Sequence, residues 1–295
     1  MSVYKHIKVE DALKENAAML KRVREVCAEH IAKDPEQFND DLFLVRFCLS
    51  HKGDEEKTVQ AVRTSIDWRF KNKDVLAQLA TGWKHPDEKI LCSYIPADLH
   101  GQTKDGSPIF IIRIGIGNPD KALEEQEHDT IRNGMVWGKE YEHKICDAET
   151  RRRGYIVKMI MIQDMKHGSI FDINRSFMSV MGSASKEMEL MYPQLVGRVV
   201  IVNPLSTIKL ILGFAQLIMP ASMFEKVTLC GAKSTVTGEL KTCPIANQVF
   251  DVEHLPTFLG GKCTCAQKGG CLGVPNEQKE KVIPNPATKK PVTTD

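Results

Sequence analysis

The sequence predicts an α/β fold in which a helical N-terminal segment precedes a mostly parallel sheet. Two observations predict it: apolar residues recur at helical spacing through residues 8–80, and four short apolar runs further along alternate with helix-length segments. Strands that alternate with helices need crossover connections, and these produce parallel pairing. A chain of 295 residues can bury a large α/β core and still enclose one ligand-sized cavity.

Three apolar stripes at helical spacing mark the N-terminal segment. They comprise Val23, Cys27 and Ile31, then Leu42, Val45 and Leu49, then Val59, Val62, Ile66 and Phe70. Asp54 stands just before the third stripe, where a carboxylate can accept hydrogen bonds from the unpaired N–H groups that begin a helix. We therefore predict a helical subdomain over residues 1–85.

The predicted strands begin after the polar turn at residues 104–106. The first is the β-rich run 108–114, and three further apolar runs span 156–162, 199–202 and 227–230. The segments 120–150, 172–190 and 205–219 between them have helix length. We predict that residues 86–262 form the α/β domain. Residues 263–295 are predicted to be a loop containing Cys and Gly, followed by a tail that is disordered from about residue 276.

The charge balance argues against a nucleic-acid partner, because 40 basic and 38 acidic side chains leave a formal net charge of only +2. The first 16 residues lack the apolar core of a secretory signal. The longest apolar-rich run, residues 205–219, is interrupted by Lys209 and is shorter than the roughly 20 residues that span a bilayer. We expect a soluble, cytoplasmic monomer.

Familiar enzyme signatures are missing from the sequence. The segment Gly-Ala-Lys-Ser-Thr at 231–235 has Ala232 where a phosphate-binding loop needs its second glycine. No Gly-x-Ser-x-Gly or His-Glu-x-x-His occurs, and the histidines are scattered. We expect neither catalysis nor a bound cofactor.

The nine cysteines fall into two groups. Five stand singly in helix-like or strand-like contexts and are expected to be buried thiols without disulfides: Cys27, Cys48, Cys92, Cys146 and Cys230. The other four, Cys243, Cys263, Cys265 and Cys271, could supply thiolates to zinc. Structural zinc sites usually use Cys-x2–4-Cys pairs instead of Cys-x-Cys, so we assign no metal ligands. A glycine-rich loop with free thiols and a zinc site both remain open.

Several sequence blocks occur together in a characteristic order. They are Asp41 to Phe47 with Trp68-Arg69, Asp105 to Ile109, Asp164 to Gly168, Tyr192-Pro193 with Gly197-Arg198, Asn203-Pro204, and Leu255-Pro256 with Gly260-Gly261. These blocks span about residues 41–262. Their order and spacing resemble the CRAL-TRIO lipid-binding family, of the type that exchanges phosphatidylinositol and phosphatidylcholine in the secretory pathway.

The resemblance implies a sheet that floors a deep apolar cavity, closed by a hinged gate helix. A lipid would be held there and carried between membranes without chemical change. The residues expected on the gate helix are Leu205, Ile208, Ile211, Leu212, Phe214 and Leu217. A helix that is apolar nearly all round is buried or faces lipid. A gate that meets acyl chains when open satisfies both conditions, and an ordinary core helix is the alternative.

The family's headgroup positions are only partly retained. The resemblance places His51, Gln194, Met223 and Lys226 where the family binds the inositol phosphate, so only the lysine keeps its role. The positions that bind choline lipid correspond to Met159, Met188, Leu99 and Phe110, which are all apolar. This lining favours a less polar ligand such as a sterol or prenyl lipid. Phosphatidylinositol stays a candidate ligand, because His51 can donate a hydrogen bond when protonated and Gln194 can bind a hydroxyl group.

Two other classes of function are open. A lipid-sensing adaptor would present its lipid to a partner enzyme and would need a recognition surface, for which the segment after Gly261 is the candidate. An α/β-hydrolase-like enzyme is disfavoured by the missing nucleophile elbow. We expect lipid binding and transfer, with transient contact between a peripheral protein and a membrane surface.

Overall fold

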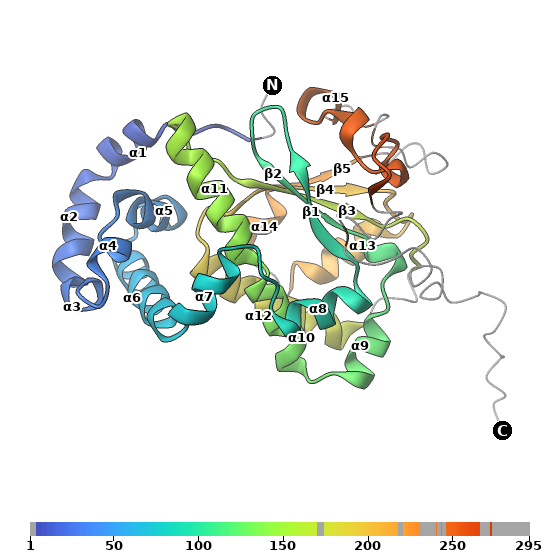
Figure 1. Cartoon of the computed structure of the whole chain (residues 1–295), viewed down its shortest axis with the longest axis horizontal. Helices are drawn as coiled ribbons and strands as arrows, with labels where there is room; N and C mark the ends of the chain where they lie inside the picture. The colour runs from blue at the N-terminus through green and yellow to red at the C-terminus, as the bar shows by residue number, and fades with distance from the viewer. Residues whose placement is uncertain are drawn as a thin grey trace.

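The computed structural model describes residues 4–169, 174–217, 221–230, 240, 243, 246–265 and 272. It contains a group of N-terminal helices and a sheet with helices packed beside it (Figure 1). Three features considered above lie outside the described residues: the segment 231–235, Cys271 and the tail from about residue 276. No helix among the described residues combines the length and apolarity that crossing a bilayer requires.

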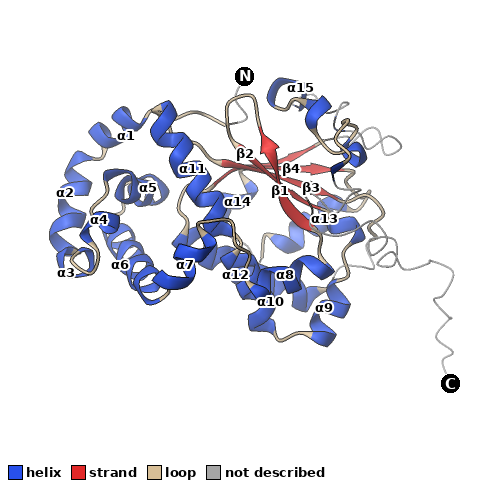
Figure 2. Ribbon diagram, viewed as in Figure 1, coloured by secondary structure: helices blue, strands red, loops and turns tan. Residues whose placement is uncertain are grey.

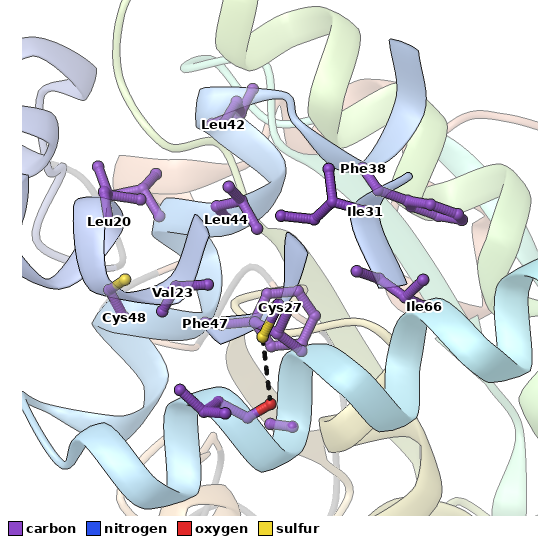
Figure 3. Close-up of a cluster of buried hydrophobic side chains, with 14 of the residues drawn as sticks. Leu20, Val23, Cys27, Ile31, Phe38, Leu42, Leu44, Phe47, Cys48 and Ile66 are labelled. Carbon is purple, nitrogen blue, oxygen red and sulfur yellow. Dashed lines mark hydrogen bonds between the residues drawn. The ribbon is translucent and has the colours of Figure 1, made fainter. Parts of the chain in front are cut away.

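The predicted N-terminal helices are confirmed. Its helices are α1 (Val9–Glu15), α2 (Ala17–Val26), α3 (Ala28–Ile31), α4 (Pro35–Phe38), α5 (Asp41–His51), α6 (Glu55–Lys71) and α7 (Lys73–Leu79). Asp54 caps α6 as predicted, since its carboxylate accepts a hydrogen bond of 3.1 Å from the backbone N–H of Lys57. The three stripes converge on one core, in which the Cys27 thiol donates to the Val59 carbonyl (Figure 3). Phe70, in the last turn of α6, is the exception and is exposed.

Buried charges join this helical group to the rest of the chain. Arg69 of α6 forms an ion pair of 3.1 Å with Glu140, and both side chains are at most 2% exposed. Arg46 of α5 is equally buried and donates to the Thr150 hydroxyl at 3.2 Å. Glu140 and Thr150 lie on α11 (Lys139–Arg153), which therefore connects the helical group to the sheet.

One five-stranded sheet contains the four predicted strands and one more. In spatial order its strands are β1 (Ala97–Gln102), β2 (Pro108–Ile112), β3 (Met159–Asp164), β4 (Val196–Val202) and β5 (Val227–Leu229). The pairs from β2 to β5 are parallel, as predicted, whereas β1 pairs antiparallel with β2. The sequence of β1, Ala-Asp-Leu-His-Gly-Gln, lacks an apolar run because an edge strand needs to bury few side chains.

The crossover helices cover one face of the sheet. They are α9 (Pro119–Glu125), α10 (His128–Trp137), α11, α12 (Arg175–Met191), α13 (Ile208–Ala215) and α14 (Ala221–Phe224). Here each parallel strand lies next to the one that follows it in the chain. When such strands are joined by right-handed crossovers, all the connecting helices lie on the same face of the sheet. In Figure 2, α9, α10 and α12 lie below the sheet together with α8 (Pro86–Tyr94), which precedes β1.

The opposite face is covered by the C-terminal part of the chain. Ile111, Ile160 and Val200 on this face pack against Phe250 and Leu259. The covering elements are the short helix α15 (Ala246–Val249) and the 3-10 turns at Val252–His254 and Thr257–Leu259. Leu272 is buried in the same cluster. Because side chains of a strand alternate between faces, the neighbours of these residues point toward the crossover helices.

The expectation for Cys230 was wrong. Cys230, just after β5, forms a disulfide with Cys243, and their Cα atoms are 4.9 Å apart. The two cysteines are 13 positions apart, and only the return of the chain over the sheet brings them together. Four other single cysteines carry no disulfide, as expected: Cys27, Cys48, Cys92 and Cys146.

Candidate functional site

The four apolar residues expected to line the site lie together on the helix-covered face of the sheet. Leu99 on β1 is paired in register with Phe110 on β2, and Met159 begins β3. Met188 comes from α12 above them. Phe110, Met159 and Met188 are buried and Leu99 is half-buried, all in one cluster that also includes Ile208 of α13. Residues far apart in the sequence thus form one apolar surface beneath α13.

The predicted gate helix is shorter than expected. It spans Ile208–Ala215, so Leu205 lies in the loop before it and Leu217 in the turn after it. In the loop before the helix, Asn203 adopts a left-handed conformation, with φ at 52°. The Asn203 amide also donates to Asp164 Oδ1 at 2.7 Å, which ties the loop to the end of β3.

The two sides of this segment have different surroundings. Ile208 is buried, and Leu205, Ile211 and Leu212 are half-buried against the cluster of Phe110 and the methionines. In contrast, Leu210 is 67% exposed and Leu217 is 79% exposed. The Phe214 side chain lies outside the described residues. The segment therefore presents two leucines to solvent while its other side packs on the apolar cluster.

A polar cluster gathers around Gln194, one of the expected headgroup residues. Gln194 has a left-handed backbone, with φ at 62°. Its Oε1 accepts a hydrogen bond of 2.6 Å from Lys158 Nζ, and its Nε2 donates to Ser50 Oγ at 2.9 Å. Ser50 precedes His51 at the end of α5. Gln194 thus connects the helical subdomain to the residue that enters β3.

Two lysines of this cluster have pKa values below the ordinary value for lysine. Burial and the positive charge of Lys226 lower the pKa of Lys158 to about 8. Burial also lowers the pKa of Lys226, against the attraction of Glu189 and Glu225. The pKa of His51 is lowered by burial too, and Asp54 and Glu189 oppose that shift. Two partly buried cations without a carboxylate hydrogen-bonded to either are suited to an anionic group.

Sequence reasoning missed Lys158 and a second lysine, Lys139. Lys139 is 4% exposed, and its Nζ lies 3.4 Å from the centre of the Phe110 ring and donates to Glu142 Oε1 at 3.1 Å. A buried ammonium group therefore adjoins the otherwise apolar lining. Lys158 could have been found from the sequence, because it is a charged residue just before a buried strand. Lys139 could not, because nothing in the local sequence distinguishes it from other lysines on helices.

A shallow surface depression lies beside Leu99 but has a different character. Trp83, Trp137 and Tyr141 line it together with the charged residues Lys84, Glu88, Asp98 and Glu142. Lys84 forms an ion pair of 2.7 Å with Asp98 inside it. Leu99 belongs both to this lining and to the apolar cluster, so the depression adjoins the cluster that packs against α13, which is the candidate site.

A sheet covered by crossover helices on one face, with a helical subdomain before it, defines an α/β protein of the CRAL-TRIO class. The model of the CRAL/TRIO domain matches residues 93–261, more than half of the chain. The chain therefore belongs to the CRAL/TRIO domain family.

Curated relatives and a solved structure agree with this assignment. The phosphatidylinositol/phosphatidylcholine transfer protein SFH12 of Arabidopsis thaliana is 26% identical over 242 residues, covering 81% of this chain and 42% of that protein. SFH14 of the same plant is 27% identical over 248 residues, with coverage of 81% and 40%. This chain thus spans about two fifths of their length. The crystal structure of Sfh5 superposes with a TM-score of 0.60 at 12% identity, over 92% of this chain and 96% of that one, and supports the fold.

Proposed function

We propose that the protein binds one lipid between the helix-covered face of the sheet and α13, and transfers or presents it between membranes. One observation carries the proposal: the segment that closes the apolar cluster also exposes Leu210 and Leu217. When α13 moves away from the sheet, its packed side can meet acyl chains and the cluster becomes accessible to a lipid. Burial of each lipid CH₂ then contributes about 0.8 kcal/mol.

No bond has to be made or broken in this process, so we propose a carrier and not an enzyme. The names of the Arabidopsis relatives, which are transfer proteins for phosphatidylinositol and phosphatidylcholine, support the lipid class in general. We further propose that the protein acts as a peripheral protein, touching the membrane through the α13 segment.

For the ligand, we propose a low-polarity lipid such as a sterol or isoprenoid. Met159, Met188, Leu99 and Phe110 offer no hydrogen-bond partner to a choline phosphodiester. A buried polar group left without a partner costs about 1–3 kcal/mol, so a phospholipid headgroup at this position would be disfavoured. Methionine side chains also adapt to guests of different shape.

The ligand class can be tested by competition. Purified protein is incubated with vesicles that contain a sterol, an isoprenoid, phosphatidylcholine and phosphatidylinositol in equal amounts, re-isolated, and examined by native mass spectrometry and lipid extraction. We expect mainly a low-polarity lipid. Stoichiometric phosphatidylinositol would contradict the ligand proposal but would leave lipid binding in place, whereas protein without lipid would contradict both.

Phosphatidylinositol is the second candidate ligand, favoured by the two lysines near Gln194. Lys226→Ala should lower phosphatidylinositol transfer by about 10- to 100-fold, because a charge-assisted hydrogen bond to the phosphate contributes about 1.5–3 kcal/mol. Uptake of a sterol should not change. The measurement is transfer of each labelled lipid between vesicles, with the exposed Lys89→Ala on α8 as the control. Equal losses for both lipids would mean that Lys226 supports structure or membrane contact.

A further inference from the structure

A cluster of metal-ligating side chains lies on the sheet face opposite the proposed lipid site. His100 comes from β1, and Cys263 and Cys265 follow the loop Leu255 to Gly261. Leu99 packs with the cluster beneath the crossover helices, whereas His100 contacts the backbone carbonyl of His254 in the C-terminal segment that covers the other face. The cluster therefore joins the edge strand to the segment that covers this face.

The ligand atoms of the cluster lie close enough together to reach one metal ion. The Cys263 and Cys265 sulfur atoms are 2.8 Å apart, and Cys265 Sγ lies 3.9 Å from His100 Nδ1. All three ligand atoms lie within 4.8 Å of one another. Zinc–sulfur and zinc–nitrogen bonds of about 2.3 and 2.0 Å at tetrahedral angles separate the ligand atoms by about 3.5–3.8 Å. To reach this arrangement, the two sulfur atoms have to move apart by about 1 Å.

The histidine ring is oriented as a metal ligand. His100 Nε2 lies 2.8 Å from the backbone carbonyl oxygen of His254. A carbonyl oxygen only accepts, so in the neutral ring Nε2 carries the proton, and Nδ1, which faces Cys265, is the nitrogen that can bind a metal. Metal-bound histidines are usually held in this way, with the second ring nitrogen donating to a carbonyl or carboxylate.

The backbone holds Cys263 in place independently of any metal. Its N–H donates to the Leu255 carbonyl at 3.0 Å, and its carbonyl accepts from the Thr257 N–H at 3.1 Å. The Gly261 N–H donates to the Pro256 carbonyl at 3.2 Å and closes the loop. Leu255 and Leu259 anchor this loop in the buried cluster on the sheet. Ligands that are positioned before binding lose little entropy when a metal binds.

We propose that His100, Cys263 and Cys265 bind one Zn²⁺ ion, with water at the fourth position. Two thiolates and one imidazole form a ligand set that suits zinc. Binding converts two thiols to thiolates and releases their two protons to solvent, while the neutral imidazole contributes its Nδ1 lone pair. The ion fastens the C-terminal segment to β1 and so stabilises the cover on the face opposite the lipid site.

This site differs from the four-cysteine set that the sequence suggested. Cys243 is occupied by its disulfide with Cys230, and its place is taken by a histidine more than 150 positions away from the Cys-x-Cys pair.

The test uses the full chain, reduced with a phosphine and stripped with a chelator. Zn²⁺ is titrated against a fluorescent competitor, and Co²⁺ is added separately to detect thiolate-to-metal charge-transfer absorption. We expect one ion per chain. His100→Gln, Cys263→Ser and Cys265→Ser should each weaken Zn²⁺ binding by at least about tenfold, because loss of a supporting contact alone costs about 10–100-fold. The cysteine variants should also weaken the Co²⁺ band.

Cys92→Ser is the matched control, since Cys92 is half-buried on α8 and outside the cluster, and it should bind Zn²⁺ like the unmodified chain. Circular dichroism establishes that each variant is folded, and His100→Ala serves as a second variant if His100→Gln is not. The proposal is overturned if the reduced chain takes up no stoichiometric Zn²⁺, or if folded His100 variants bind it unchanged. Isolation of a stable Cys263–Cys265 disulfide that prevents zinc uptake even after reductant treatment would also overturn it.

Discussion

Replacing Leu210 and Leu217 together by glutamate is expected to lower lipid transfer between vesicles by at least about 100-fold. Each leucine gains about 1.5–3 kcal/mol when it is buried in an apolar environment, and a carboxylate in the acyl region costs kilocalories more. The protein fold should not change, because these side chains are 67% and 79% exposed. The measurements are co-flotation with vesicles and transfer of a labelled lipid.

A matched control tests whether the loss of transfer depends on where the two new charges lie or only on their number. Phe70→Glu with Tyr141→Glu adds the same two charges on α6 and α11, at residues that are each 39% exposed. This variant should transfer lipid normally. Leu210→Ala with Leu217→Ala should give an intermediate loss, since it removes apolar surface without adding charge. Normal transfer by a folded Leu210→Glu/Leu217→Glu protein would rule out this segment as the membrane contact.

The second large effect concerns stability. Glu140→Ala leaves the Arg69 guanidinium buried without its partner, and breaking a buried ion pair costs about 3–5 kcal/mol in the free energy of unfolding. Because the pair connects α6 to α11, the loss should destabilise the junction of the helical subdomain with the sheet. The midpoint of urea unfolding, followed by circular dichroism, measures the effect.

Glu55→Ala provides the comparison on the surface. Glu55 pairs with Arg22 at 2.8 Å, but both side chains are about half exposed, and such a pair contributes about 0–1 kcal/mol. The double variant Arg69→Met/Glu140→Met should recover much of the lost stability, since it leaves no unpaired charge. A Glu140→Ala protein no less stable than Glu55→Ala would show that Arg69 finds another partner.

The sequence by itself determined the order of helices and strands and the family. Helical spacing around Val23, Val45 and Val62 and the apolar runs at 108–114 and 199–202 are local patterns, and the structure confirms each of them. The same patterns placed Ile208 and Ile211 in an apolar helix, whereas its bounds, Ile208–Ala215, came only from the tertiary structure. Strand β1 escaped notice because it is an edge strand.

Only the tertiary structure decided which distant side chains meet. Lys158 reaches Gln194 and Ser50, Lys139 lies against Phe110, and His100 approaches Cys265 because strand order and crossover direction bring their elements together. Sequence spacing carries no information about such pairs, since contacts across more than 30 positions depend on how whole elements pack. The sequence could therefore indicate an apolar site with Gln194 and Lys226 nearby, but the buried lysines and the histidine beside the cysteine pair emerge only when the chain is folded.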